Sequence, residues 1–384
     1  MSRTAGHPAR TASRPQQPPA VRLSATVMAH PRRAASAGRL ARLLGGDAEV
    51  VYDPLPDGPS NAMRTAVEAW SRCPAGSTHH MVLQDDVVPT ADFTALAVAA
   101  AARHPDAAIA LYANSNSWNG VTARTALLAG YRWVPTVPYD YFPTQVALMP
   151  CAMAHEFVAY ARPIVPFDGA DDEALTRFLD ERGHPSALRV PNLVQHDDQP
   201  SLTGLDHQGI RRSVVFMEAA GSSPGTDDAC FHLLPALPFF RQRRARLRVL
   251  LSGRGRTQGY WTVGRGAQLD LLGMDRRRIA AVADSVVARM GESGGLPQRR
   301  AVTAAFVAEV YLGALGLGWA AARLARDHGR HMAVLPSPVH DRVLDSYVES
   351  GLGFDADLTV WRPHLGLLRE LALRGVNEST GEGG

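Results

Sequence analysis

Two adjacent carboxylates, Asp85 and Asp86, come directly after an apolar run at residues 80–83 that is typical of a strand. Two carboxylates beside a buried strand are costly unless a cation or hydrogen-bond donors lie near them. Mg²⁺ and Mn²⁺ prefer oxygen ligands and share them with substrate phosphates, so the pair is a candidate site for a metal-bridged diphosphate. A solvated turn before the next helix would have the same sequence, and these residues alone leave both interpretations open.

An acidic pair and a histidine further along the chain could also carry chemistry. Asp171 and Asp172 begin a predicted helix at residues 171–182. A carboxylate there can act as a general base if it reaches the proton of a nucleophile, or it can simply complement the helix dipole. His196 ends an extended segment and is either a metal or phosphate contact or an ordinary structural histidine. Taken one at a time, both groups favour the structural interpretation.

The elements that position these residues alternate between strands and helices. Strands are predicted at residues 23–28, 49–52, 80–83 and 108–112, and helices at 34–44, 61–70 and 91–103. This alternation indicates an α/β fold with a doubly wound, mostly parallel sheet, in which ligands bind beyond the carboxyl ends of the strands. Five polar side chains fall at such ends, namely His30, Asp53, Asp85, Asp86 and Asn114. The sequence therefore predicts that they converge on one edge of the sheet.

The remaining sequence divides by composition and periodicity. We predict a disordered tail at 1–20, the α/β domain at 21–220, an Arg-rich linker region at 221–258, a helical domain at 259–375 and a second disordered tail at 376–384. Helices are expected at 276–290, 299–312, 319–328, 338–350 and 363–374. The arginines of 241–248 are interpreted as a solvated helix face, because few aromatic residues interleave with them as they would on a nucleic-acid surface.

Composition narrows the classes of protein. The chain has 384 residues, is 46% hydrophobic and 20% charged, and carries a net charge of +3, which indicates a globular protein of about two domains with no need for a nucleic-acid partner. Abundant Ala, Arg, Gly and Pro with Lys nearly absent favour a high-GC genome, such as an actinobacterial one.

Three cysteines without close spacing argue against a disulfide framework, fit a reducing cytoplasm, and leave Cys151 as ordinary core packing. The apolar run at 310–322 is too short to cross a bilayer, so a buried helix, no transmembrane segment and a cytoplasmic location are expected.

Together these segments resemble a GT-A-type glycosyltransferase over residues 21–205. The run Val-Met-Ala-His-Pro ending at Pro31 resembles the first strand and nucleotide-contact loop of that family, and residues 53–64 resemble the segment that holds the nucleoside. Leu-Gln-Asp-Asp-Val at 83–87 resembles its metal-binding acidic motif in the lipooligosaccharide-type version. Here Gln84 replaces the first acidic residue, so the motif has two carboxylates instead of three.

The later motifs extend the resemblance. Asp-Asp-Glu-Ala-Leu at 171–175 resembles the segment whose aspartate is the base in inverting members, although Asp171 stands where the family has Glu. Val-Gln-His at 194–196 resembles the late histidine of the metal site. The implied roles are metal ligands at Asp86 and His196, nucleotide contacts at His30, Asp53, Asn61, Arg64 and Asp85, and a base at Asp172 with Asp171 beside it. Aromatic faces suit sugar rings, so Trp118, Tyr139 and Tyr141 are added as acceptor contacts.

These implications predict a metal-dependent, inverting glycosyltransferase. It would use Mn²⁺ or Mg²⁺ and a nucleotide-sugar donor, with a UDP-sugar favoured, and would glycosylate a hydroxyl of a natural product, peptide or glycan. One alternative is a sugar-phosphate nucleotidyltransferase, but that class usually has a Gly-rich loop where this chain has residues 30–33. Another is a non-catalytic binding or scaffold protein. The helical half is a candidate for homo-oligomer formation or partner docking.

Overall fold

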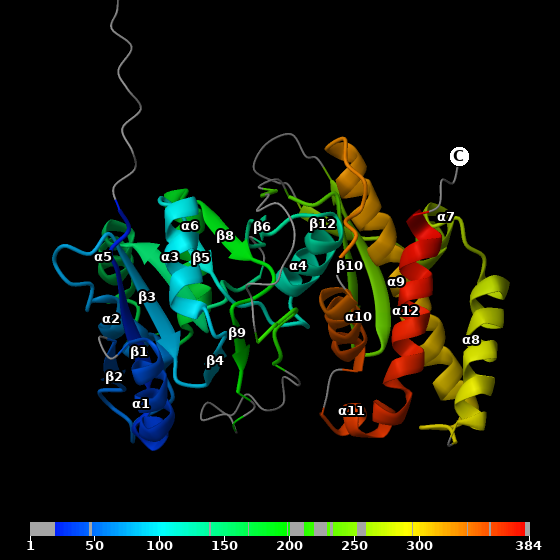
Figure 1. Cartoon of the computed structure of the whole chain (residues 1–384), viewed down its shortest axis with the longest axis horizontal. Coiled ribbons are helices and arrows are strands. Elements are labelled where there is room, and N and C mark those ends of the chain that lie inside the picture. Colours follow the sequence, from blue (N-terminus) through cyan, green and yellow to red (C-terminus); the bar gives the residue numbers. More distant parts are fainter. Residues whose placement is uncertain are drawn as a thin grey trace, which may run out of the picture.

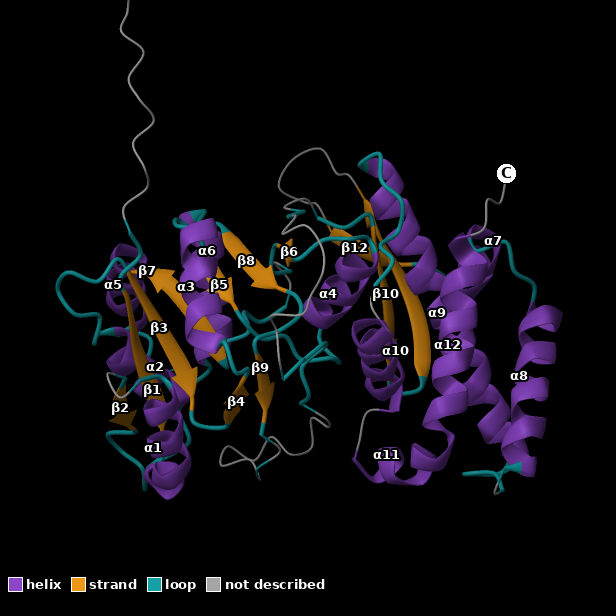
Figure 2. Ribbon diagram, in the orientation of Figure 1, coloured by secondary structure: helices purple, strands orange, loops and turns teal. Residues whose placement is uncertain are grey.

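The computed structural model describes residues 20–45, 48–137, 140–167, 169–197, 199, 211–218, 229–230, 233–251, 259–293, 295–335, 337–352 and 355–380. Two lobes lie side by side along the long axis (Figure 1). One holds a large β-sheet with helices on both faces, and the other is mainly helical (Figure 2). The two predicted terminal tails fall largely outside the described residues. The second tail was predicted to begin at residue 376, which is wrong, because the last helix continues to Thr380.

The first lobe is built on a seven-stranded sheet in the order β2-β1-β3-β7-β5-β8-β6. The strands are β1 (Leu23–Ala29), β2 (Glu49–Tyr52), β3 (His79–Gln84), β5 (Ala108–Ala110), β6 (Trp133–Val134), β7 (Val146–Pro150) and β8 (Ser186–Arg189). All run in one direction except β7 and β6, which pair antiparallel with their neighbours. The predicted α/β fold with a mostly parallel sheet is therefore confirmed.

Helices cover both faces of this sheet because its strands alternate apolar side chains between two cores. In β1, Met28 packs into one core, while Val27 and Ala29 pack into the other. The first core also contains residues of α2 (Ala62–Trp70), α4 (Trp118–Leu128), α5 (Cys151–Ala161) and α6 (Asp171–Arg182). The second contains residues of α1 (Ala34–Leu43) and α3 (Phe93–Arg103). A small ladder of β4 (Val87–Pro89) and β9 (Val194–His196) lies beside the sheet.

The second lobe begins with an antiparallel sheet of β10 (Ala236–Arg241), β11 (Arg244–Leu251) and β12 (Gly259–Thr262). The helix predicted for the arginines of 241–248 is therefore wrong. Arg244 and Arg246 alternate with the buried Ala245 and Leu247, which is the two-residue period of a half-buried strand. Residues 236–251 of the predicted linker thus form an ordered hairpin of this lobe, while Ala229 pairs with Trp133 of β6.

The helices that follow are α7 (Arg265–Leu271), α8 (Arg276–Glu292), α9 (Arg300–Asp327), α10 (Ser337–Leu352), α11 (Asp355–Trp361) and α12 (Leu365–Thr380). The two helices predicted at 299–312 and 319–328 form the single helix α9. It packs closely on α12 because small residues face each other: a Cβ at Gly318 would collide with Val376, and one at Gly375 would lie 2.8 Å from Ala314. Helix α9 is long and apolar enough to cross a membrane, but 67% of its most apolar 18-residue stretch is buried inside the structure. This agrees with the buried helix predicted at 310–322.

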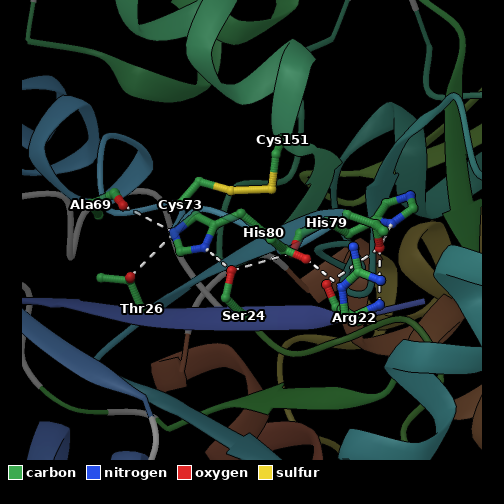
Figure 3. The surroundings of a disulfide bond; sticks show 10 residues. Arg22, Ser24, Thr26, Ala69, Cys73, His79, His80 and Cys151 are labelled. Atoms are coloured by element: carbon green, nitrogen blue, oxygen red, sulfur yellow. Dashed lines mark hydrogen bonds between the residues drawn. A yellow bond between two sulfur atoms is a disulfide. The ribbon is translucent and has the colours of Figure 1, made fainter. Parts of the chain in front are cut away.

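A disulfide joins Cys73, which follows α2, to Cys151 at the start of α5 (Figure 3). The prediction that Cys151 is ordinary packing and that the chain has no disulfide is therefore wrong. Spacing along the chain misled it: β3 pairs antiparallel with β7, His79 lies opposite Pro150, and α2 packs on α5. These contacts bring cysteines 78 residues apart to a Cα–Cα distance of 6.2 Å. The cysteine count consequently gives no support for a reducing compartment.

Candidate functional site

A cavity of about 1130 Å³ opens at the carboxyl ends of β1, β2 and β3. The chain passes from β1 outward to β2 and then returns to β3 on the other side of β1, so the order of the strands reverses at this point. Such a reversal leaves a crevice between the loops that follow the strands, and ligands bind there in open α/β sheets. Predicted site residues that line it are His30, Asp53, Asn61, Asp85, Asp86, Tyr141, Asp171, Asp172 and His196. Asn114 lines it as well.

The acid pair at the end of β3 is bridged by an arginine. The Nη1 atom of Arg33 lies 3.0 Å from Asp85 Oδ1 and 2.6 Å from Asp86 Oδ2, and the three side chains are only 8–9% exposed. The backbone N–H of His30 donates to Asp85 Oδ2 at 3.1 Å. Burial and the neighbouring Asp86 carboxylate raise the pKa of Asp85, which the arginine and this N–H partly offset. The guanidinium therefore neutralises a pair that burial alone would disfavour.

His196 meets the same pair through the small ladder. Val87 lies opposite His196, and the N–H of Asp197 donates to the carbonyl of Asp86 at 2.7 Å. This pairing places His196 Nε2 3.5 Å from Asp86 Oδ2, with the histidine side chain 2% exposed. Residues separated by about 110 positions along the chain are thus held together by backbone hydrogen bonds, which fix their side chains more firmly than a free loop could.

The donor set fits a divalent cation of the kind that the resemblance implies. Asp86 Oδ1 is buried and, within the described part of the chain, has no hydrogen-bond partner. A buried carboxylate oxygen without a partner is what a cation ligand would leave in a structure without the cation. Asp86 and His196 supply the oxygen and nitrogen donors that Mn²⁺ accepts. The described residues contain no cluster of three or more acidic, histidine or cysteine ligands. Any cation held here would therefore complete its shell with substrate oxygens and water, as Mg²⁺ and Mn²⁺ commonly do.

Several predicted nucleotide contacts are engaged in shaping the cavity wall. Arg64 forms a bidentate pair with Asp53 at 2.7 and 2.8 Å, and this hydrogen bonding lowers the pKa of Asp53. Asn61 caps α2 by accepting from the N–H of Arg64 and donates to Val165 O at 2.9 Å. Arg64 itself is not among the residues that line the cavity. Contacts of these residues with a nucleoside stay predictions.

The imidazole of His30 is also engaged. Its Nδ1 accepts from the backbone N–H of Arg32 at 3.1 Å, which leaves the proton on Nε2 to donate to Pro56 O at 3.2 Å. These two bonds fix the short turn Pro31–Arg33 between β1 and α1. The ring therefore positions the loop that carries Arg33, while the backbone N–H of His30 reaches Asp85.

The second acidic pair lies across the cavity at the start of α6. Asp171 is 7% exposed, and burial followed by the neighbouring charge of Asp172 raises the pKa of Asp171 to about 7. A hydrogen bond from the Thr144 side chain opposes this rise. Asp172 is half-buried and accepts from the N–H of Glu173 at 2.8 Å. Close to neutral pH, this pair can hold or release a proton.

The loop before this pair adds a third carboxyl group. Asp140 accepts from the backbone N–H and side chain of Asn119 at 2.9 and 3.1 Å, and burial raises the pKa of Asp140 to about 6. Tyr141 lines the cavity, and burial raises the pKa of its hydroxyl well above the usual range. The hydroxyl of Tyr141 thus stays protonated and can donate a hydrogen bond.

The other two predicted acceptor contacts are not placed in the cavity. Trp118 stacks on Phe239 of β10 at a centroid distance of 4.0 Å, and the guanidinium of Arg248 lies 4.3 Å from its ring. It therefore packs the two lobes together and does not line the cavity. Tyr139 lies outside the described residues.

The cavity also contains cationic side chains that sequence reasoning did not assign. They are Arg32, Arg33, Arg211 and Arg241. Arg33 could have been suspected, because it follows the end of β1 beside the end of β3 and its acid pair. Arg241 and Gln242 reach the cavity from the β10–β11 turn of the second lobe, a contribution that follows from tertiary packing alone.

No protein-family model and no curated protein matches this sequence. The function therefore has to be inferred from the geometry of this cavity.

Proposed function

We propose that the chain is a glycosyltransferase that moves a sugar from a nucleotide-diphosphate sugar to an acceptor hydroxyl. One observation carries the proposal: the buried Asp86–His196 pair and the Asp171–Asp172 pair line the same cavity at the strand-order reversal. The first pair suits a cation-bound diphosphate, and the second suits removal of a proton. The resemblance over residues 21–205 makes GT-A the favoured fold family and a UDP-sugar the favoured donor.

Two groups of residues would act on the two ends of the reaction, one on the leaving diphosphate and one on the acceptor hydroxyl. A Mn²⁺ or Mg²⁺ ion held by Asp86 and His196 would stabilise the negative charge of the leaving diphosphate. The acceptor oxygen attacks the anomeric carbon as the bond to the diphosphate oxygen breaks, and the hydroxyl proton passes to the Asp171–Asp172 pair. A base whose pKa lies near the working pH is effective, and Asp171 has this property. Asp172 is the more exposed member and is the proposed direct contact with the hydroxyl.

Nucleotide binding is the first test. Calorimetry with UDP, GDP and dTDP, each with and without Mn²⁺, should show metal-dependent binding of one nucleotide. The binding should be lost in Asp86→Ala and kept in Asp92→Ala, since Asp92 is an exposed carboxylate outside the cavity. If no nucleotide binds to the folded protein, the transferase proposal fails, and the scaffold alternative becomes the better one.

The base assignment is tested separately from binding. Asp172→Asn should bind the nucleotide like the wild type but lose transfer, measured as sugar incorporation into an acceptor library by mass spectrometry. Loss of a general base costs about 10²–10⁴-fold in rate. Undiminished transfer by Asp172→Asn would remove Asp172 from this role and leave Asp171 as the candidate.

A further inference from the structure

The second lobe contributes a cationic side chain to the cavity of the first. Arg241 and Gln242, at the β10–β11 turn, line the cavity. Arg241 is half-buried, and within the described part of the chain its side chain forms no ion pair and no hydrogen bond. A guanidinium that has lost part of its hydration without gaining an anionic partner favours the binding of an anion beside it. The cavity therefore offers an anion-binding group that the chain itself does not use.

The turn that carries Arg241 has an unfavourable backbone conformation. Gln242, with φ of 50°, and Arg243, with φ of 59°, both lie in the left-handed region, where two-residue hairpin turns usually have Asn and Gly. Other residues are held there only by the surrounding structure, and such positions cluster at binding sites. Here the N–H of Arg243 donates to Gly351 O at 2.7 Å, and its Nη1 donates to Gln298 Oε1 at 3.3 Å. These bonds fix the turn on the second lobe, with Arg241 at the cavity.

Electrostatics place Arg241 on the side of the cavity that holds the proposed base. Burial raises the pKa of Asp140 to about 6, and the positive charge of Arg241 is among the effects that oppose this rise. The segment after Asp140 is bonded to the first turn of α6. The N–H of Phe142 donates to Thr176 Oγ1 at 2.7 Å, and this hydroxyl donates to Asp172 O at 2.8 Å. Arg241 thus acts on the wall that continues to Asp172.

This location assigns the anion to the acceptor and not to the donor. The donor diphosphate is proposed to lie at Asp86 and His196, across the cavity from the Asp171–Asp172 pair. The acceptor hydroxyl has to approach Asp172, on the side that Arg241 shares. A guanidinium holds a carboxylate or phosphate through two parallel N–H···O bonds, which fix the orientation of the bound molecule as well as its position.

We propose that Arg241 is a specificity-determining residue that binds a carboxylate or phosphate group of the acceptor and so orients the acceptor hydroxyl toward Asp172. The inference rests on the proposed function, since it names the acceptor class for the same cavity. The acceptor is then an acidic molecule, and a neutral molecule of the same shape binds poorly.

Two probes that differ in one charged group test the proposal. Phenyl β-D-glucuronide has a carboxylate where phenyl β-D-glucoside has a hydroxymethyl group. Each is titrated by calorimetry into the protein alone and into the protein with saturating UDP and Mn²⁺. The wild type should bind the glucuronide at least about tenfold more tightly than the glucoside, as expected for a hydrogen bond to a charged group.

Substitutions of the arginine assign this preference to one side chain. Arg241→Met should reduce the preference for the glucuronide to about twofold or less. Arg241→Lys, the second variant in case Arg241→Met does not fold, keeps the charge without the fork and should retain only part of the preference. Arg246→Met is the matched control. Arg246 is an exposed arginine of β11 outside the cavity, so its loss should leave the preference unchanged within about twofold.

The outcomes separate this inference from the proposed function. If the wild type binds none of UDP, GDP and dTDP with any metal, the proposed function has failed and the acceptor role falls with it. If a nucleotide binds but the two probes bind equally, or the preference persists in Arg241→Met, only the role of Arg241 is overturned.

Two other results would also overturn that role. A loss of UDP affinity of at least about tenfold in Arg241→Met would show that its anion is the donor phosphate. An equal loss of the glucuronide preference in Arg246→Met would reduce Arg241 to one part of a diffuse positive field.

Discussion

The titration of Asp171 gives a direct test of the electrostatics on the acceptor side of the cavity. Its carboxyl group has a pKa of about 7 in the folded protein, against 3.8 for the ordinary group, because it is buried beside Asp172. Between these two pH values the folded chain binds more protons at this position than the unfolded chain. The free energy of unfolding therefore falls as pH rises through this window, and the loss is complete above about pH 7.

The magnitude follows from the same numbers. One pKa unit corresponds to about 1.4 kcal/mol, so the full difference would destabilise the wild type by about 4 kcal/mol at pH 8. Asp171 shares its titration with Asp172, and relaxation reduces the cost further, so we expect about half of this value. Asp171→Asn keeps an acceptor for Thr144 without the buried charge. It should be more stable than the wild type by roughly 2 kcal/mol at pH 8, and by clearly less at pH 5.

Urea denaturation of both proteins at pH 5 and pH 8 measures the effect. Other groups also make the free energy of unfolding depend on pH: Asp140 has a raised pKa of about 6, and His80 has a lowered pKa of about 4, so their contributions have opposite signs. Both proteins contain these groups, so the difference between variant and wild type isolates the contribution of Asp171. Asp180→Asn, an exposed change on the same helix, should give the same difference at both pH values. If the difference between Asp171→Asn and the wild type is the same at both pH values, the raised pKa of Asp171 is refuted.

Two further predictions concern packing and pairing, each measured as a change in the free energy of unfolding. Gly351→Ala should destabilise the protein by roughly 2–4 kcal/mol, because the added Cβ would collide with the ring of Phe240. Gly366→Ala is the control: it has open space around it and should stabilise α12 by up to about 1 kcal/mol. A similar cost for both glycines would contradict the close approach. Arg64→Met should cost about 1–3 kcal/mol at pH 7, since it leaves the half-buried Asp53 without its bidentate partner, while loss of the exposed Arg72 ion pair should cost under about 1 kcal/mol.

Local sequence patterns predicted the first lobe well. Apolar runs of strand length, followed by polar residues and ten-residue helices, were sufficient to predict the parallel sheet and the edge at which His30, Asp53 and the acid pair meet. This succeeded because the carboxyl ends of parallel strands share one edge, so a local pattern carries information about long-range position. The late His196 was found through its motif, and the β4–β9 ladder explains why it returns to Asp86.

The misses share a physical cause. The pairing of Asp85 and Asp86 with Arg33 depends on β1 and β3 being neighbours, and the pairing of Trp118 with Phe239 depends on how the two lobes pack, so local sequence alone specifies neither. The charge of the β11 arginines favours a solvated helix face, whereas their two-residue period indicates the strand that is observed. Even that period would not have predicted that the β10–β11 turn brings Arg241 to the cavity, because this depends on how the two lobes pack.

The disulfide offers the last prediction, because it decides what the cysteines say about the compartment. Cys73 and Cys151 are joined, and among the described cysteines Cys230 is the one outside a disulfide, and it is buried. Protein purified without reductant, denatured and treated with iodoacetamide should therefore take one label, at Cys230, and three after reduction, as counted by mass spectrometry.

Closing a loop of 78 residues stabilises by roughly 2–5 kcal/mol, so reduction or Cys73→Ser should lower the free energy of unfolding by that amount. Disulfides persist mainly in oxidising compartments. Three labels without reductant would instead show a reduced pair and would favour the cytoplasmic location expected from the sequence.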